Sequence, residues 1–204
     1  MKEMIARFNS TKEDVDLLIG NDDEQIWKSI AVEKFYKLLG QYLPKDAKNK
    51  KPRMIDSQII ATGPNCTVIR QPDHKRIVTY GHKAYRINFP NAVYFVSHSE
   101  TKISNIDVYT YIKWNGVNTT LYRMPMPNMT SSERMCIGTA DRKIRKGNII
   151  QALENVLDAE YTHDRVDNLK QSTSTVRWFN HLKKSKVKTT DLKKPQCKLK
   201  DLVE

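Results

Sequence analysis

The sequence has few cysteines and no long apolar run, and these two absences exclude several classes of protein. Its three cysteines, Cys66, Cys136 and Cys197, lie far apart and form no C-x-x-C pair, so neither a disulfide framework nor a zinc site is indicated. No window holds the roughly 20 apolar residues that a membrane-spanning helix needs, and the first residues lack the apolar run of a signal peptide. We therefore expect a cytoplasmic chain with reduced thiols and no membrane partner.

Basic residues are in clear excess over acidic ones. The 204 residues include 35 Lys and Arg against 23 Asp and Glu, which gives a formal net charge of +12. This balance favours an acidic partner, such as a nucleic acid or an acidic protein, as much as it favours an ordinary basic surface. Apolar residues make up 39% of the chain, so a packed core can form beneath that surface.

Three regions with different hydrophobic periods follow one another along the chain. Residues 21–43 carry apolar side chains at helical spacing after an acidic start, which predicts a packing helix. The basic stretch 44–53 is then predicted to be an exposed connection. From residue 55 to residue 122, short β-branched and aromatic runs separated by turns predict an antiparallel meander. Helical spacing returns in residues 148–161 and 174–184.

The clearest strand of the meander is predicted over residues 105–114. On one face it presents apolar residues, which are Ile106, Val108, Ile112 and Trp114. Asn115 and Gly116 follow, and this pair supplies the left-handed backbone that a tight two-residue hairpin turn requires. The next run, residues 117–124, is therefore predicted to return as the partner strand.

This order of helix, strands, irregular loop and helices predicts an α+β fold. We expect an N-terminal extension with a packing helix and a basic linker over residues 1–54, a core over residues 55–182, and a lysine-rich tail over residues 183–204. The tail is expected to be a solvated extension or a short helix that docks late. Its charge makes nucleic acid a further candidate partner, although the sequence has no helix-turn-helix or zinc-finger motif.

The irregular loop after the strands contains the residues most suggestive of chemistry. Two prolines before Asn128 rule out regular strand pairing, and the Asn128 amide can donate hydrogen bonds while its oxygen accepts them. Cys136 stands between two apolar neighbours, and Gly138 permits a tight bend. Several basic residues nearby favour a thiolate, and they are Arg134, Arg142, Lys143 and Arg145. On these residues alone, a buried structural cysteine is the simpler interpretation.

The element order and this loop resemble the ubiquitin-conjugating enzyme fold. In that family a His-Pro-Asn tripeptide precedes the catalytic cysteine, and here Met126-Pro127-Asn128 leads to Cys136 at the same spacing of eight. Met126 departs from the family pattern because it replaces the histidine. A closer likeness, over roughly residues 25–204, is to the bacterial branch called PRTRC system protein B, or prokaryotic family D. Its motifs match Thr119-Thr120-Leu121-Tyr122, Met135-Cys136-Ile137-Gly138-Thr139 and Tyr161-Thr162-His163.

The resemblance implies acyl transfer through a thioester. Cys136 would accept the C-terminal carbonyl of a ubiquitin-like protein from an activating enzyme, and an amine would then attack that carbonyl. Asn128 would stabilise the oxyanion, brace the loop, or do both. His163 would orient or deprotonate the amine, or cap a helix end. The ubiquitin-like protein and the activating enzyme are the implied partners, and the chemistry needs no cofactor and no metal.

Two other interpretations stay open. An inactive relative would serve as a scaffold or a DNA-associated protein of a plasmid-borne gene cluster, with Cys136 in a structural role. A cysteine protease would need a base paired with Cys136, and only His163 or His98 is available for that part. Asp141 is the nearest acidic residue after Cys136, and it would lower the pKa of an attacking lysine only if the loop folds back.

Overall fold

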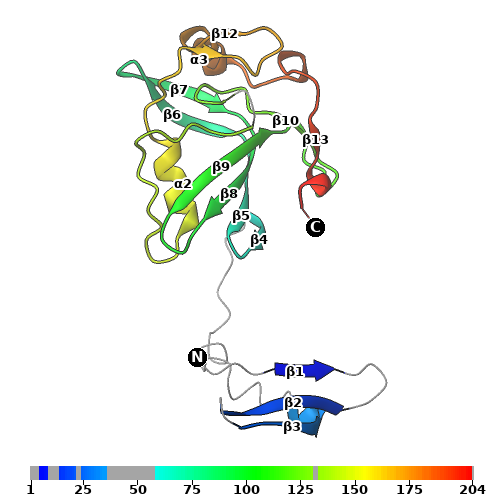
Figure 1. Cartoon of the computed structure of the whole chain (residues 1–204). Helices are drawn as coiled ribbons and strands as arrows, with labels where there is room; N and C mark the ends of the chain where they lie inside the picture. Colours follow the sequence, from blue (N-terminus) through cyan, green and yellow to red (C-terminus); the bar gives the residue numbers. More distant parts are fainter. Residues whose placement is uncertain (1–4, 9–13, 22–23, 36–57, 131–132, 204) are drawn as a thin grey trace. The chain divides into compact units, whose positions relative to one another are not determined.

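The computed structural model describes residues 5–8, 14–21, 24–35, 58–130 and 133–203 (Figure 1). The chain divides into two compact units, residues 1–54 and 55–204. Among the described residues, no helix combines the length and the apolar character that a membrane crossing demands.

The first unit contains a small antiparallel sheet. Its strands are β1 (Ile5–Phe8), β2 (Asp14–Asn21) and β3 (Glu24–Ala31), in that order. The strand β2 pairs with β3 along its whole length, from Asp14 opposite Ala31 to Asn21 opposite Glu24. Residues 32–35 then form a single helical turn, and Phe35 is buried with Val15.

The packing helix predicted over residues 21–43 is wrong for residues 24–31, which form β3. The apolar residues Ile26 and Ile30 are four apart, and this spacing fits one turn of a helix and two alternations of a strand equally well. Pairing with β2 decides between the two, and such pairing is not visible in a local window. Residues 36–43 and the predicted basic connection over 44–53 lie outside the described residues.

The second unit is built on a six-stranded antiparallel sheet, in the order β13-β10-β9-β8-β5-β4. The strands are β4 (Ile59–Gly63), β5 (Cys66–Gln71), β8 (Ala92–His98), β9 (Ile103–Thr110), β10 (Thr120–Arg123) and β13 (Cys197–Lys198). The prediction of antiparallel strands in an α+β fold is therefore confirmed. On β9, Ile106 and Val108 are buried, as the alternating pattern predicts.

The strands do not form one continuous meander, because a hairpin leaves the sheet. The strands β6 (His74–Tyr80) and β7 (Lys83–Phe89) form a separate two-stranded sheet, and β8 returns to pair with β5. Tyr80 lies opposite Lys83, and the two residues between them have positive φ angles, 55° at Gly81 and 58° at His82. This is the mirror-image turn that matches the twist of a hairpin.

The turn after β9 is longer than the tight hairpin that Asn115-Gly116 predicts. The strand β9 ends at Thr110, and pairing with β10 starts at Tyr122 opposite Thr110. Gly116 does have a positive φ of 51°, but Ile112 is 38% exposed rather than buried. Tyr111 and Trp114 instead pack together on the opposite face of the sheet.

Two helices complete the second unit. The helices are α2 (Ile149–Leu157), capped by the Asn148 side chain, and α3 (Thr175–Lys184), capped by Ser174. Leu153 of α2 and Phe179 of α3 are buried in one apolar cluster with side chains of β5–β9. Val176, which the helical pattern placed in the core, is 42% exposed, and Trp178 is buried instead.

The predicted lysine-rich tail is not a solvated extension. After α3 it passes through the short helix η2 (Thr189–Asp191), then pairs with β10 as β13 and ends in the short helix η3 (Leu199–Asp201). Leu199 is buried, and its N–H donates to the Thr119 carbonyl at 2.9 Å. The tail therefore forms an edge of the sheet, as Figure 1 shows.

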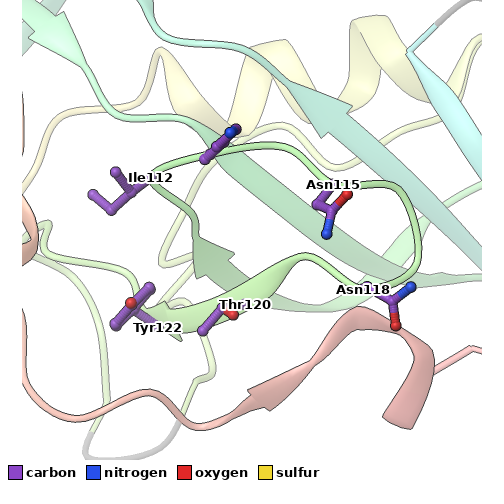
Figure 2. A pocket seen from close by; sticks show the side chains of 6 residues that line it. Ile112, Asn115, Asn118, Thr120 and Tyr122 are labelled. Carbon is purple, nitrogen blue, oxygen red and sulfur yellow. The ribbon is translucent and has the colours of Figure 1, made fainter.

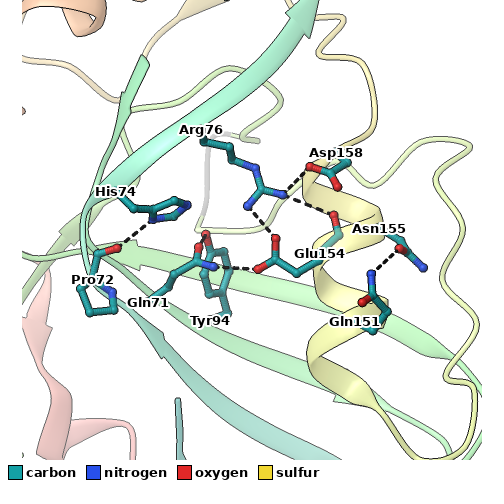
Figure 3. A network of polar contacts seen from close by, with 9 residues as sticks. All are labelled: Gln71, Pro72, His74, Arg76, Tyr94, Gln151, Glu154, Asn155 and Asp158. Atoms are coloured by element: carbon teal, nitrogen blue, oxygen red, sulfur yellow. Dashed lines mark hydrogen bonds and ion pairs between the residues drawn. The ribbon is translucent and has the colours of Figure 1, made fainter. Parts of the chain in front are cut away.

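A polar network joins α2 to β5 and β6 (Figure 3). The nearly buried guanidinium of Arg76 donates to Glu154 Oε2 at 2.7 Å and to Asp158 Oδ1 at 2.6 Å. Gln71 Nε2 donates to the other oxygen of Glu154 at 2.7 Å, and the buried Tyr94 hydroxyl donates to Gln71. Both Glu154 oxygens are thus occupied, so the register of α2 against the sheet is held by directional bonds as well as by packing.

Replacing Arg76 with Ala should lower the free energy of unfolding by about 2–4 kcal/mol, because the carboxylate of Glu154 would lose its cation in a largely buried place. The matched change Asp158→Asn should cost less than about 1 kcal/mol, since that side chain is 65% exposed. Urea unfolding followed by circular dichroism measures both changes. Equal losses of unfolding free energy in the two variants would show that the network does not depend on the Arg76 charge.

Candidate active site

The loop that follows β10 is anchored in the interior. Residues 124–128 are all buried, and Met126 is only 2% exposed within the main apolar cluster. The indole N–H of Trp178 donates to the Pro125 carbonyl at 2.6 Å, and Asn168 Nδ2 donates to the Met124 carbonyl at 3.2 Å. An apolar side chain and bonds from two other segments therefore hold the loop at the point where the family pattern has a histidine.

Asn128 joins this loop to the segment that follows α2. Its side-chain Oδ1 accepts the backbone N–H groups of Thr162 and His163, each at 2.9 Å. Backbone N–H groups can only donate, so these two bonds identify the oxygen of the amide and leave Nδ2 as its other end. Nδ2 makes no hydrogen bond to any residue that the structure describes. Asn128 has a positive φ of 61°, a conformation that Asn tolerates better than most residues.

Cys136 lies in a hairpin-like return of the same loop. Its N–H donates to the Asn128 carbonyl at 2.7 Å, Met129 pairs with Met135, and the Thr130 N–H donates to the Arg134 carbonyl at 2.9 Å. These bonds close the loop, so Asn128 and Cys136, eight residues apart in the sequence, lie next to each other at its two ends.

The return segment of this loop also pairs with β9, along the part of that edge that β10 leaves uncovered. The Met135 N–H donates to the Ile106 carbonyl at 2.9 Å, and the Val108 N–H donates to the Glu133 carbonyl at 2.9 Å. Met135 is buried, and because neighbouring side chains of an extended segment point to opposite sides, Cys136 points outward. The cysteine is exposed, so the interpretation of Cys136 as a buried structural residue is wrong.

Carboxylates offset part of the positive charge around the cysteine. Arg134 lies 3.6 Å from Asp107, and Arg145 donates to Asp141 at 2.8 Å. A hydrogen bond from the Lys143 N–H, followed by the one from Arg145, lowers the pKa of Asp141 below its ordinary value. The Asp141 carboxylate, in the chain segment after the cysteine, is therefore ionised and already accepts hydrogen bonds from Lys143 and Arg145.

His163 is placed beside Asn128 through its backbone. Its carbonyl accepts the Thr175 hydroxyl at 2.6 Å, which ties this segment to the start of α3. His98, the other candidate base, is engaged elsewhere, since its ring lies 3.0 Å from the Thr67 hydroxyl and 3.0 Å from the Ser99 carbonyl. No histidine ring is hydrogen-bonded to Cys136 among the residues described, so the protease interpretation gains no support.

The three predicted site residues, Cys136, Asn128 and His163, thus lie within one hydrogen-bonded unit. Sequence reasoning missed Trp178 and Asn168, which hold the loop from behind, and no motif marks either residue. It did single out the Tyr161-Thr162-His163 element, but for the histidine ring rather than for its backbone N–H groups. Within the described ranges, no three His, Cys, Asp or Glu side chains cluster closely enough to hold a metal.

Thiol reagents should modify Cys136 first, because the other two cysteines are half-buried. Burial raises the pKa of the Cys66 and Cys197 thiols, and Asp107 and Asp201 respectively add to this effect. A raised pKa leaves less thiolate near neutral pH, so labelling of these two should accelerate only as the pH becomes more alkaline. Peptide mass spectrometry after timed labelling measures the order, and a slow Cys136 would contradict the exposed position.

Comparison with known proteins agrees with this architecture. The family model described as prokaryotic E2 family D matches residues 34–202, which is most of the chain. Searches of curated proteins and of solved structures each returned no match. The matched range contains the buried Asn128, the exposed Cys136 and the segment that joins them. The chain belongs to prokaryotic E2 family D.

Proposed function

We propose that this protein is a ubiquitin-like-protein conjugating enzyme that carries its cargo on Cys136. The Cys136 thiolate attacks the thioester carbonyl presented by an activating enzyme, a new S–C bond forms, the C–S bond to the activating enzyme breaks, and its cysteine leaves as a thiolate. An amine then attacks the same carbonyl, a C–N bond forms, the Cys136 thiolate leaves, and the amine proton passes to a base. An exposed thiol held next to an anchored asparagine is the observation that carries this proposal.

Asn128 is proposed as the donor to the oxyanion of each tetrahedral intermediate. Its Oδ1 is occupied by two N–H groups, so the amide is oriented before substrate arrives and Nδ2 is the end that can donate. A donor that needs no reorganisation contributes about 3–4 kcal/mol at the upper end. The same bonds brace the loop, so Asn128 has both of the roles that the sequence allows.

His163 is proposed to accept the proton of the attacking amine. The ring is half-buried on a segment that Asn128 and Thr175 hold from two sides. An imidazole is the side chain that most often serves as a general acid or base in enzymes. The closer likeness to PRTRC system protein B, carried by residues 119–139, stays a prediction.

Incubation with the activating enzyme, ATP and the ubiquitin-like protein should give an adduct on the wild type that a thiol reductant removes. Cys136→Ala should form no adduct, and Cys136→Ser should form an oxyester that resists the reductant, because an alkoxide leaves less readily than a thiolate. Cys66→Ser and Cys197→Ser are matched controls and should keep the labile adduct. A labile adduct on Cys136→Ala would defeat the assignment.

Asn128→Asp separates the two roles of Asn128. The carboxylate can still accept the N–H groups of Thr162 and His163, so the fold should persist, but it has no hydrogen to donate. Discharge of the thioester to an amine should therefore slow by about 100- to 1,000-fold. Asn128→Ala should show similar slowing together with a loss of about 1–3 kcal/mol in stability, since the partly buried backbone N–H groups of Thr162 and His163 lose their acceptor.

The same single-turnover discharge assay tests His163. His163→Ala should slow discharge by about 100-fold at neutral pH while loading of Cys136 stays near the wild-type rate, because only the second step releases an amine proton. Normal discharge by Asn128→Asp would show that the amide only braces the loop. Normal discharge by His163→Ala would show that the ring is not the base.

A further inference from the structure

A second site is formed where the C-terminal segment diverges from β10. The strand β13 pairs with β10 only at Thr120 and Leu121, and the last bond of that edge runs from the Gln196 N–H to the Leu121 carbonyl. Farther back, Leu192 is buried and pairs with Leu169. The chain between these anchors stands away from β10 and lines an open cavity of about 800 Å³.

The cavity is lined by positive charge. Arg123, Lys170, Lys193 and Lys194 all contribute to its wall, and no Asp or Glu belongs to its described lining. The three lysines are exposed and make no ion pair with another described residue, whereas Arg123 lies 3.3 Å from Glu133. Two threonine hydroxyls, of Thr189 and Thr190, add further donors.

The neighbouring cavity shows that this charge is local. It has a volume of about 330 Å³ and lies along the turn between β9 and β10 (Figure 2). Tyr122 lines both cavities, but the smaller one is walled mainly by amides and hydroxyls, such as Asn115, Asn118 and Thr120, and has Lys113 as its one cation among the described lining residues. An anion would therefore be attracted to the larger cavity rather than to the whole of this edge.

We infer that the larger cavity binds an acidic polypeptide segment of a partner protein. Its volume lies in the range of about 300–1,000 Å³ that is typical of ligand clefts. Separated lysines act as point charges on flexible stems, so they suit the separated carboxylates of Asp and Glu side chains along a polypeptide. The one arginine of this site is already paired with Glu133.

Nucleic acid fits the cavity less well. A duplex is read by an element that protrudes into its groove, and this site is concave. A single strand needs aromatic rings on which bases stack, and Tyr122, the one aromatic residue in the described lining, is half-buried.

The position of the cavity indicates where such a partner would sit. Glu133, the partner of Arg123, precedes Cys136 by three residues and is bonded to β9 through its carbonyl. A protein whose acidic segment occupies the cavity would therefore touch the flank of the cysteine loop. The inference concerns binding by the unmodified chain and does not depend on the transfer chemistry.

Fluorescence anisotropy of the full chain with a fluorescein-labelled octaglutamate peptide tests the inference. The wild type should bind at about 50 mM salt and more weakly at about 200 mM. Lys193→Glu/Lys194→Glu should weaken binding about tenfold, and Lys170→Glu, on a different segment, should weaken it about threefold. The control Lys75→Glu/Lys83→Glu changes net charge by the same amount on the β6–β7 hairpin and should weaken binding less than about twofold.

A labelled thymidine octamer of similar charge serves as the competing probe. Tighter binding of the octamer, lost in Lys193→Glu/Lys194→Glu, would overturn the inference in favour of nucleic acid. Equal loss of peptide binding in the cavity variants and in the control would show that the peptide is held by general charge attraction and not by the cavity. No binding by the wild type would overturn the inference. All five changed lysines are exposed, so melting followed by circular dichroism should show each variant folded.

Discussion

The side-chain oxygen of Asn128 accepts two backbone N–H groups from residues 162 and 163, and the geometry of the cysteine loop depends on this contact. The bonds join segments that are far apart in the sequence and hold one end of the loop in the interior. The other end is fixed because the Cys136 N–H donates to the Asn128 carbonyl. One residue thus sets the position of the cysteine backbone through its main chain and the orientation of its own amide through its side chain. Its left-handed backbone is the local cost of meeting both demands.

The rest of the second unit supports this contact from behind. Trp178 and Thr175 of α3 bond to the Pro125 and His163 carbonyls, so the helix holds both of the segments that meet at Asn128. Edge pairing with β9 keeps Met135 inward and the next side chain outward. An exposed thiol is therefore supported by a buried frame, and such support is how a loop can be held rigid. Met126 stands where ubiquitin-conjugating enzymes, which this loop resembles, have a histidine, and its apolar side chain is accommodated because that position faces the apolar cluster.

Positive charge is distributed unevenly over the second unit, so the excess of basic residues does not act equally everywhere on its surface. Around the cysteine, Asp107 and Asp141 pair with arginines. Across the loop, beyond Arg123 and Glu133, three lysines line a cavity whose described lining includes no Asp or Glu. The net charge of the sequence does not distinguish these two places.

Alternation in residues 59–110 and helical spacing in residues 149–157 were enough to predict strands and a helix, because each pattern is local and buries one face. The spacing of eight between Asn128 and Cys136 likewise identified this loop as the candidate site. Residues 24–31 could not be assigned in this way, since their apolar spacing suits both periods and only pairing with β2 selects the strand. Nor does sequence spacing indicate whether a thiol is exposed, or that the Thr162-His163 element acts on Asn128 through backbone N–H groups. Sequence alone therefore determined the element types where the pattern fits a single period, and it determined the chemical groups of the candidate site. Tertiary structure decided which groups meet and which side chain faces solvent, because these depend on contacts between residues remote in the chain.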